Sequence, residues 1–248
     1  MRFQTLILIL LFPLLPFAQL PHFEQLDILK NVRSYDVNYT YQDNSGFIWF
    51  GTSEGLIRFN GIDYKNFTIV DSLYSNEVTA MVQDSAGNFW IGHSSGQITM
   101  GIPGKFQKWM PEEGLPKQQI TTFFIDNKNN IWFGTAGEGI YYYNHKRIYN
   151  INTDDGLSDN FIYSIKQDKH QRFWIATDYG LNIYDKKERT FSLISMKDGL
   201  PDNIVKDFYF IDSSMVLIGM EDEGLTILNL TDTTFSPPVN WQFGPLNN

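Results

Sequence analysis

The sequence contains no cysteine among its 248 residues. Disulfides, thiolate metal sites and a cysteine nucleophile are therefore excluded. An exported chain without disulfides fits a bacterial cell envelope better than it fits a disulfide-stapled secreted domain. Basic residues are also few, since the formal net charge is −9, and phosphate binding needs clustered Lys and Arg. We therefore expect no nucleic-acid partner.

Long hydrophobic runs are absent as well. The apolar run from Leu6 to Phe17 is about a dozen residues long and is interrupted by two prolines, whereas a membrane-spanning helix needs ~20 residues. We predict a signal peptide over residues 1–18 and export of residues 19–248 to the periplasm or another extracytoplasmic site. The rival interpretation is an uncleaved membrane anchor. Any other membrane contact is expected only through a part absent from this chain.

Sequence motifs for catalysis are missing too. The chain has no Walker loop, no nucleophile elbow and no HExxH pair, each of which would indicate a definite chemistry. We therefore predict no catalytic residues, no metal and no cofactor.

What the chain does have is one stretch of sequence that recurs several times. Its first copy is Asp43–Leu56, DNSGFIWFGTSEGL, and a degraded fifth copy carries Leu217 in place of the tryptophan. The tryptophans of the four intact copies are 41, 42 and 42 residues apart: Trp49, Trp90, Trp132 and Trp174. A constant period near 42 residues is typical of a propeller or a solenoid.

Each repeat can be divided into four short strands. The run Phe47–Phe50 is aromatic and β-branched, which favours a buried strand, and glycine-containing turns flank it. Four antiparallel strands per 42 residues make a propeller blade. We predict an all-β propeller of five repeats, near 32–72, 73–114, 115–156, 157–199 and 200–236. The first strands are expected to begin at Val37, Val78, Ile120, Ile162 and Val205.

The repeats resemble the two-component regulator propeller family, the extracytoplasmic sensor repeats of bacterial histidine kinases and hybrid two-component systems. The matching stretches include Gln42–Leu56 and Gln167–Leu181, together with the linkers DDGLSDNFI and KDGLPDNIV. The resemblance spans roughly residues 32–235. It implies a seven-bladed ring, often followed by an immunoglobulin-like domain, a membrane helix and a kinase core. No such later part is present in this sequence, so kinase activity is not expected in this chain.

The repeated acids and tryptophans have a structural and a functional interpretation. A calcium site or a catalytic site needs several acidic side chains that converge on one point. One acidic residue in each turn fits a role in capping that turn. We therefore predict structural roles for Asp43, Asp84, Asp126 and Asp168, and place Asp212 in the same phase. The tryptophans are predicted to pack between blades rather than to form a ligand cage.

Function is expected where the copies differ. The turns between second and third strands should share one face with the linkers that precede each blade, and binding residues concentrate on such loops. The alternative is that these are ordinary solvated turns. The candidates for a ligand-binding face are Glu54, His93, Glu138, Asp178, Tyr179, Glu221 and Asp222.

Three functions remain open from the sequence. The first is a sensor that binds a small molecule, such as a saccharide, and passes the signal to a partner. The second is a five-bladed carbohydrate-active hydrolase, which requires two carboxylates at a defined separation. The third is an exported protein–protein scaffold.

Closure of the ring is a separate question. Phe23–Leu26 has no host blade, because the fifth repeat supplies its own outer strand near Thr233–Phe235. Either five blades close with a spare strand, or the ring is an incomplete set of seven. We expect the second, together with self-association.

Overall fold

The structure is a computed structural model that describes residues 36–238. The predicted signal peptide and Phe23–Leu26 lie outside the described residues. All described residues fall within one unit of the chain, Ser34–Asn248.

Five four-stranded antiparallel sheets follow one another along the chain. Blade 1 comprises β1 (Val37–Gln42), β2 (Ile48–Thr52), β3 (Gly55–Phe59) and β4 (Tyr64–Phe67). Blade 2 comprises β5 (Val78–Gln83), β6 (Phe89–His93), β7 (Ile98–Ile102) and β8 (Lys105–Trp109). Blade 3 comprises β9 (Ile120–Ile125), β10 (Ile131–Thr135), β11 (Ile140–Tyr143) and β12 (Ile148–Ile151). Blade 4 comprises β13 (Ile162–Gln167), β14 (Phe173–Thr177), β15 (Gly180–Asp185) and β16 (Thr190–Ile194). Blade 5 comprises β17 (Val205–Phe210), β18 (Met215–Met220), β19 (Leu225–Asn229) and β20 (Thr234–Phe235).

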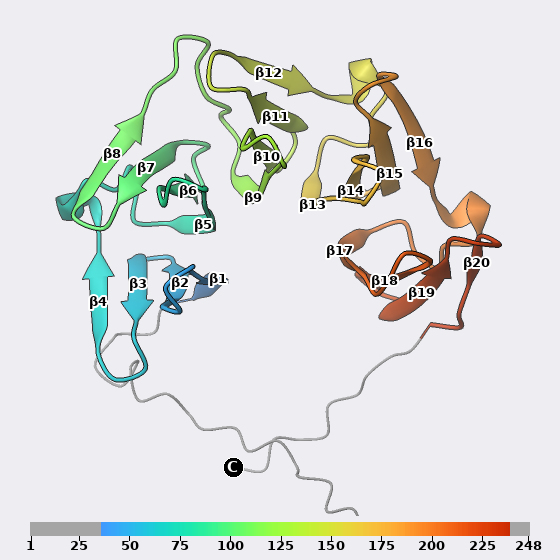
Figure 1. Cartoon of the computed structure of the whole chain (residues 1–248), viewed down its shortest axis with the longest axis horizontal. Helices are drawn as coiled ribbons and strands as arrows, with labels where there is room; N and C mark the ends of the chain where they lie inside the picture. The colour runs from blue at the N-terminus through green and yellow to red at the C-terminus, as the bar shows by residue number, and fades with distance from the viewer. Residues whose placement is uncertain (1–35, 239–248) are drawn as a thin grey trace, which may run out of the picture. The chain divides into compact units, whose positions relative to one another are not determined.

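The blades stand side by side around a common centre, with the first strand of each innermost (Figure 1). The first strands begin at the five residues that the sequence predicts, and each tryptophan stretch forms the second strand. The prediction of an all-β propeller with five repeats is therefore confirmed. No helix among residues 36–238 is long and apolar enough to span a membrane.

Each tryptophan packs against the next blade. The ring centroid of Trp49 lies 4.8 Å from that of Phe89, and the centroid of Trp132 lies 4.0 Å from that of Phe173. Both tryptophans are fully buried. Four hydrophobic clusters of this kind join consecutive blades among the described residues. Aromatic burial between blades is thus the main source of cohesion.

The glycine that stands two residues after the tryptophan lets neighbouring blades approach closely. A Cβ atom on Gly92 would lie 2.6 Å from the Cβ of Ile120, and one on Gly134 would lie 2.6 Å from the Cγ2 of Ile162. Both isoleucines open the first strand of the following blade. Glycine at this place in blades 2 and 3 therefore allows the close approach of the next blade, whereas blade 4 has a fully buried Ala176 there.

The repeated aspartate caps the turn before each tryptophan strand and also binds the tryptophan. Asp126 Oδ1 accepts hydrogen bonds from the backbone N–H groups of Lys128 and Asn130, and Oδ2 accepts one of 3.1 Å from Trp132 Nε1. Burial alone would raise the pKa of Asp126, but these hydrogen bonds hold it below its ordinary value. One carboxylate thus joins the turn to the core.

The placement of Asp212 in this phase is wrong. Tyr209 pairs with Leu217, and the N–H of Ile211 bonds to the carbonyl of Met215. Ile211 therefore occupies the aspartate position of the fifth blade. Asp212 stands one residue later, where Oδ1 accepts from the N–H of Ser214. The reason is that Leu217 has no indole N–H to bind, so the acid is free to cap the turn from the next position.

The fifth blade leaves one flank without a following blade among the described residues. Tyr209 and Ile211 on this flank are 64% and 43% exposed. The first blade is different on its opposite flank. There Thr40 occupies a strand position at which each of the other four blades has an apolar residue. Those four residues, all facing the preceding blade, are Met81, Phe123, Ile165 and Phe208.

Candidate functional site

Every innermost strand contains a β-bulge at its second residue. In β1 the pairing with β2 steps from Val37 to Tyr39 and leaves Asn38 without a cross-strand partner. A β-bulge re-aims the side chain of the extra residue. The bulged residues of the five blades are Asn38, Thr79, Thr121, Tyr163 and Lys206. The backbone position repeats, but the side-chain chemistry does not.

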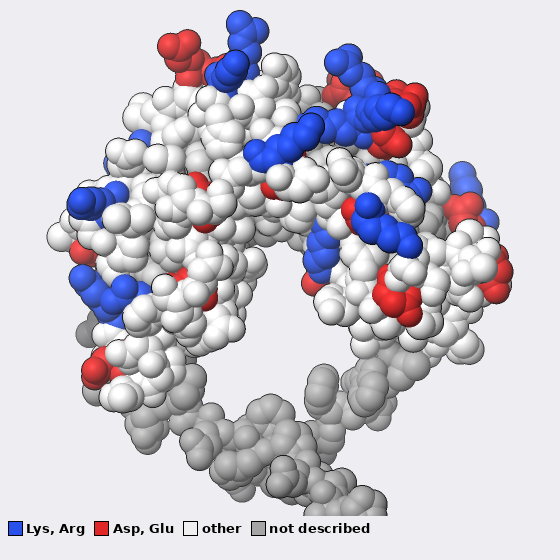
Figure 2. Space-filling view, in the orientation of Figure 1, with Lys and Arg blue, Asp and Glu red and all other residues white. Residues whose placement is uncertain are grey.

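Four of these bulged residues line a single hollow near the central axis. Its volume is about 360 Å³, and Asn38, Thr79, Thr121 and Tyr163 each contribute a side chain from a different blade. Glu77, Gln119 and Phe161, which directly precede three of the inner strands, complete much of its wall together with Tyr39. Figure 2 shows the open hollow between the innermost strands. We call this site the channel mouth.

Two of the bulged side chains tie neighbouring blades together. Asn38 Nδ2 donates to the carbonyl of Val78 at 3.1 Å, and Thr79 Oγ1 donates to the carbonyl of Ile120 at 2.6 Å. Thr121 breaks this series, because its Oγ1 is buried and has no hydrogen-bond partner among the described residues. Buried polar atoms are rarely left unpaired. Thr121 lines the hollow, but its hydroxyl oxygen is inaccessible to solvent, so a ligand would pair with it only after a local rearrangement.

A polar network extends from the channel mouth to the β14–β15 turn of blade 4 and the β18–β19 turn of blade 5. The hydroxyl of Tyr163 donates to Asp178 Oδ1 at 2.7 Å, and Lys206 Nζ lies 4.0 Å from the centroid of the Tyr163 ring. Lys206 also forms an ion pair with Glu221. Burial, followed by the hydrogen bond to Asp178, raises the pKa of Tyr163, so the phenol stays protonated. The network holds the Tyr163 ring in one orientation.

Two of the sequence-predicted residues, Asp178 and Glu221, therefore support the channel mouth. Glu138 is engaged nearby, because its Oε1 accepts from the N–H of Lys117 and its Oε2 accepts from the hydroxyl of Tyr141. Glu54, Tyr179 and Asp222 are exposed on separate turns. The structure does not gather the seven predicted residues into one site.

His93 lies inside the protein rather than on a loop surface. It is fully buried at the end of β6, where Nε2 contacts Thr99 Oγ1 at 2.9 Å and Nδ1 contacts the carbonyl of Glu77 at 3.2 Å. Burial lowers its pKa to about 4, so the imidazole is neutral at pH 7. This side chain links strand β7 to the linker before β5 and presents no atom to solvent.

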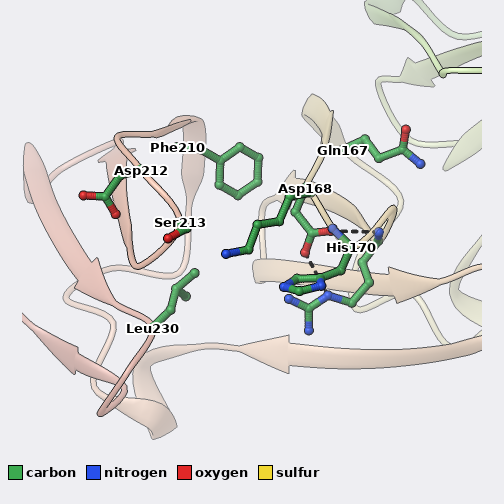
Figure 3. A pocket seen from close by; sticks show the side chains of 9 residues that line it. Gln167, Asp168, His170, Phe210, Asp212, Ser213 and Leu230 are labelled. Carbon is green, nitrogen blue, oxygen red and sulfur yellow. Dashed lines mark hydrogen bonds and ion pairs between the residues drawn. The ribbon is translucent and has the colours of Figure 1, made fainter.

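A second hollow lies between blades 4 and 5, at the turn that joins β13 to β14. It measures about 440 Å³, and its walls include Asp168, His170, Phe210 and Asp212 (Figure 3). Asp168 is already committed, because its Oδ2 accepts from Arg172 Nε and from Trp174 Nε1. The hollow forms where the fifth blade lacks the repeated aspartate and tryptophan. Across residues 36–238 no group of three or more His, Cys, Asp or Glu side chains could hold a metal ion.

A signal for the channel mouth was present in the sequence. The strand start is Val or Ile in every blade, whereas the residue after it is Asn, Thr, Thr, Tyr or Lys. A variable residue beside an invariant strand start is the pattern that a re-aimed bulge produces. The repeat period alone does not reveal this position. In a regular strand the side chains alternate between the two faces, and strict alternation would place this residue between blades.

The fold and this site define a class of protein, the β-propeller with a polar channel mouth. Three segments of the chain, residues 75–95, 114–137 and 156–179, match the family model described as the two-component regulator propeller. The resemblance predicted from the repeats is therefore confirmed.

Several known proteins are similar to this chain. "Histidine kinase P4" of Formosa agariphila is 29% identical over 199 residues, which is 73% of this chain and 14% of that protein. The extracellular domain of a protein of B. thetaiotaomicron described as a hybrid two-component system is 24% identical, with a TM-score of 0.69, over 79% of this chain and 28% of the solved chain. A virginiamycin B lyase from Staphylococcus aureus has the same fold, with 10% identity and a TM-score of 0.62, over 79% of this chain and 67% of that structure.

Proposed function

We propose that this chain is an extracytoplasmic sensor propeller of a two-component signalling system and that it binds a small polar ligand, such as a saccharide, at the channel mouth. The observation that carries the proposal is the set of bulged residues. One structural position, repeated in every blade, brings residues of three types from four blades to one hollow: Asn38, Thr79, Thr121 and Tyr163. Residues on a rigid scaffold with variable chemistry are typical of a binding site.

The chemistry of the channel mouth favours a neutral, hydroxyl-rich ligand. Asn38 and Gln119 offer amide groups, and Tyr163 and Phe161 offer aromatic faces. The two aromatic rings pack together with centroids 4.7 Å apart. Polar groups that fix hydroxyls, beside an aromatic platform, suit a ring with one apolar face.

A hydrolase of the five-bladed type is less well supported. Glycoside hydrolysis uses two carboxyl groups about 5–5.5 Å or 6.5–9.5 Å apart. Glu77 is the one acidic residue that lines the channel mouth within the described part of the chain, and its Oε2 accepts from Ser94 Oγ at 2.6 Å. The similarity to a lyase extends to the fold alone.

The binding proposal is tested by a thermal-shift screen of the purified chain against mono- and oligosaccharides, with amino acids as a comparison set. A hit should bind roughly tenfold more weakly to Gln119→Leu, which removes an amide from the wall of the hollow, and to Tyr163→Leu, which removes the aromatic face. Thr122→Val is the matched control, since Thr122 pairs with Gly134 and lies outside the bulge. Hits that ignore both channel-mouth variants would overturn the assignment of the site.

The signalling role is tested separately. The reading frame or its genomic neighbour should encode a membrane helix and a kinase core. A pull-down with that neighbour, with and without the hit compound, measures whether ligand occupancy changes the association.

A further inference from the structure

A groove on the outer rim, between blades 3 and 4, has a chemistry unlike that of the channel mouth. It measures about 500 Å³ and lies between β11 and β12 on one side and the β15–β16 hairpin on the other. Lys and Arg side chains, with Asp and Glu side chains among them, lie over the outer parts of these two blades (Figure 2), and the whole chain is acidic.

The floor of the groove is aromatic. The ring centroids of Trp132 and Tyr142 lie 4.5 Å apart. The ring of Tyr149 stacks beside that of Tyr142, with centroids 6.0 Å apart and an interplanar angle of 29°. Tyr149 is 47% exposed, so its face is open to a ligand. Tyr184 lines the facing wall.

This aromatic floor is specific to blade 3. Tyr142 pairs with Trp132 across the sheet, and no other blade has a tyrosine at that place. The equivalent residues in blades 1, 2, 4 and 5 are Arg58, Met100, Ile183 and Ile227. Packing of the repeat therefore does not require the tyrosines.

A lysine from blade 4 reaches across this floor. Lys186 Nζ lies 3.6 Å from the ring centroid of Tyr142 and 4.9 Å from that of Trp132. Its side chain is half-buried, and it forms no ion pair with any described residue. Arg189 lines the same groove and is likewise without an ion pair in this part of the chain. The one acidic residue in the wall is Asp155, whose Oδ2 accepts from the N–H of Asn152. The nearby carboxylate of Asp126 also acts on the charge of Lys186, but it is hydrogen-bonded to Asn130 and Trp132.

We propose that the groove binds a small organic anion, with its carboxylate, sulfate or phosphate ester on Lys186 and Arg189 and its ring on Tyr149. A partly desolvated cation without a carboxylate partner gains more from an anion than a solvated surface lysine does. The arginine can hold such a group through two parallel N–H donors. The open tyrosine face supplies stacking for the apolar side of the ring.

The test compares four sugars that share one ring and differ in charge: glucose, glucuronate, glucose 6-sulfate and glucose 6-phosphate. Isothermal titration of the full chain is expected to show binding of at least one anionic sugar at low ionic strength. Glucose should bind at least tenfold more weakly. Raising the salt concentration should weaken binding, since the groove opens to solvent. Failure of all three anionic sugars to bind would overturn the proposal.

Variants locate the binding. Lys186→Met should weaken binding of the anionic sugar by tenfold or more, and Lys186→Arg should restore most of it. Lys187→Met is the matched control, because Lys187 is 90% exposed and faces Glu188. Tyr149→Leu should weaken binding several-fold, whereas Tyr64→Leu on the outer strand of blade 1 should not. Equal effects of Lys186→Met and Lys187→Met would show that the anion binds elsewhere. Circular dichroism of each variant checks that the blades are intact.

Discussion

The hydroxyl of Tyr163 donates a 2.7 Å hydrogen bond to the carboxylate of Asp178. Tyr163 comes from the bulge of an inner strand, and Asp178 comes from the turn between β14 and β15. The bond therefore joins the channel mouth to the turn between the second and third strands of the same blade. A change at either end is expected to reach the other.

A double-mutant cycle measures this coupling. Tyr163→Phe and Asp178→Asn should each lower the free energy of unfolding by about 1 kcal/mol, the net contribution of a partly exposed hydrogen bond. The double variant should lose clearly less than the sum, because both changes remove one interaction. Urea unfolding gives the values, and Tyr179→Phe in the adjacent exposed position is the control. Strict additivity would mean that the bond contributes nothing.

The aspartate–tryptophan pair of blade 3 should matter more than a turn cap does. Trp132→Ala is expected to cost ~3–5 kcal/mol, the range for deleting a large buried aromatic side chain. From the sequence, Asp126→Ala would cost ~1 kcal/mol, as a cap does. Because the carboxylate also binds the indole, we now expect about 2–3 kcal/mol. Denaturation of both variants beside Asp63→Ala, an exposed acid of blade 1, decides the matter. Small and equal losses would place Trp132 outside the core.

Stability should depend on pH through His93. Its folded pKa, lowered to about 4 by burial, lies below the value near 6.5 of an unfolded histidine. The contribution is therefore fully present above pH 6.5 and is lost as the pH falls from 6.5 toward 4, because the unfolded chain takes up the proton first. The free energy of unfolding should fall as the pH falls, at a slope that approaches about 1.4 kcal/mol per pH unit. Measurement of the free energy of unfolding at pH 7, 6 and 5 should show this loss in the parent chain and in His170→Gln, but not in His93→Thr. A slope unchanged in His93→Thr would contradict this assignment.

The glycine at the close approach between blades allows a matched comparison. Gly92→Ala would place a Cβ 2.6 Å from Ile120 of the next blade, so we expect a loss of about 1–3 kcal/mol from overpacking. Gly219 stands at the same place in blade 5, where a Cβ would meet only Leu225 and Asp207 of its own blade at 3.4 Å or more. Gly219→Ala should be nearly neutral. An equal loss at Gly219 would reveal another surface packed on the fifth blade.

The open flank of blade 5 should promote self-association. Exposed apolar groups and sheet edges of this kind are normally covered in soluble proteins, and Tyr209 and Ile211 are the most exposed members of the flank. Light scattering of the mature chain should show dimers or larger species, and Tyr209→Lys should shift them toward monomer. A compact monomer at high concentration would mean that the flank is covered.

The sequence predicted the blades well because each strand is specified five times. Val78 and Ile120 mark strand starts that the structure reproduces, since burial between blades repeats with the chain. The binding residues were harder to predict, because a bulge is a single departure from alternation. His93 illustrates the difficulty: as a replacement for threonine it pointed to a loop function, yet the ring turns inward to Thr99. Which way a side chain turns at a strand end depends on three-dimensional neighbours that are distant in sequence.

The bulges have a consequence for how such proteins diversify. A residue such as Thr121 or Lys206 takes no part in the cross-strand ladder, so replacing it leaves the pairing register of its blade intact. Most ligand-contacting positions in a protein carry some share of the packing, and altering them trades stability for a new specificity. Here the bulged position is free of the cross-strand ladder in each blade, although Asn38 and Thr79 also tie neighbouring blades through hydrogen bonds. A lineage could therefore exchange its ligand through a handful of single-codon changes while the surrounding architecture stays untouched.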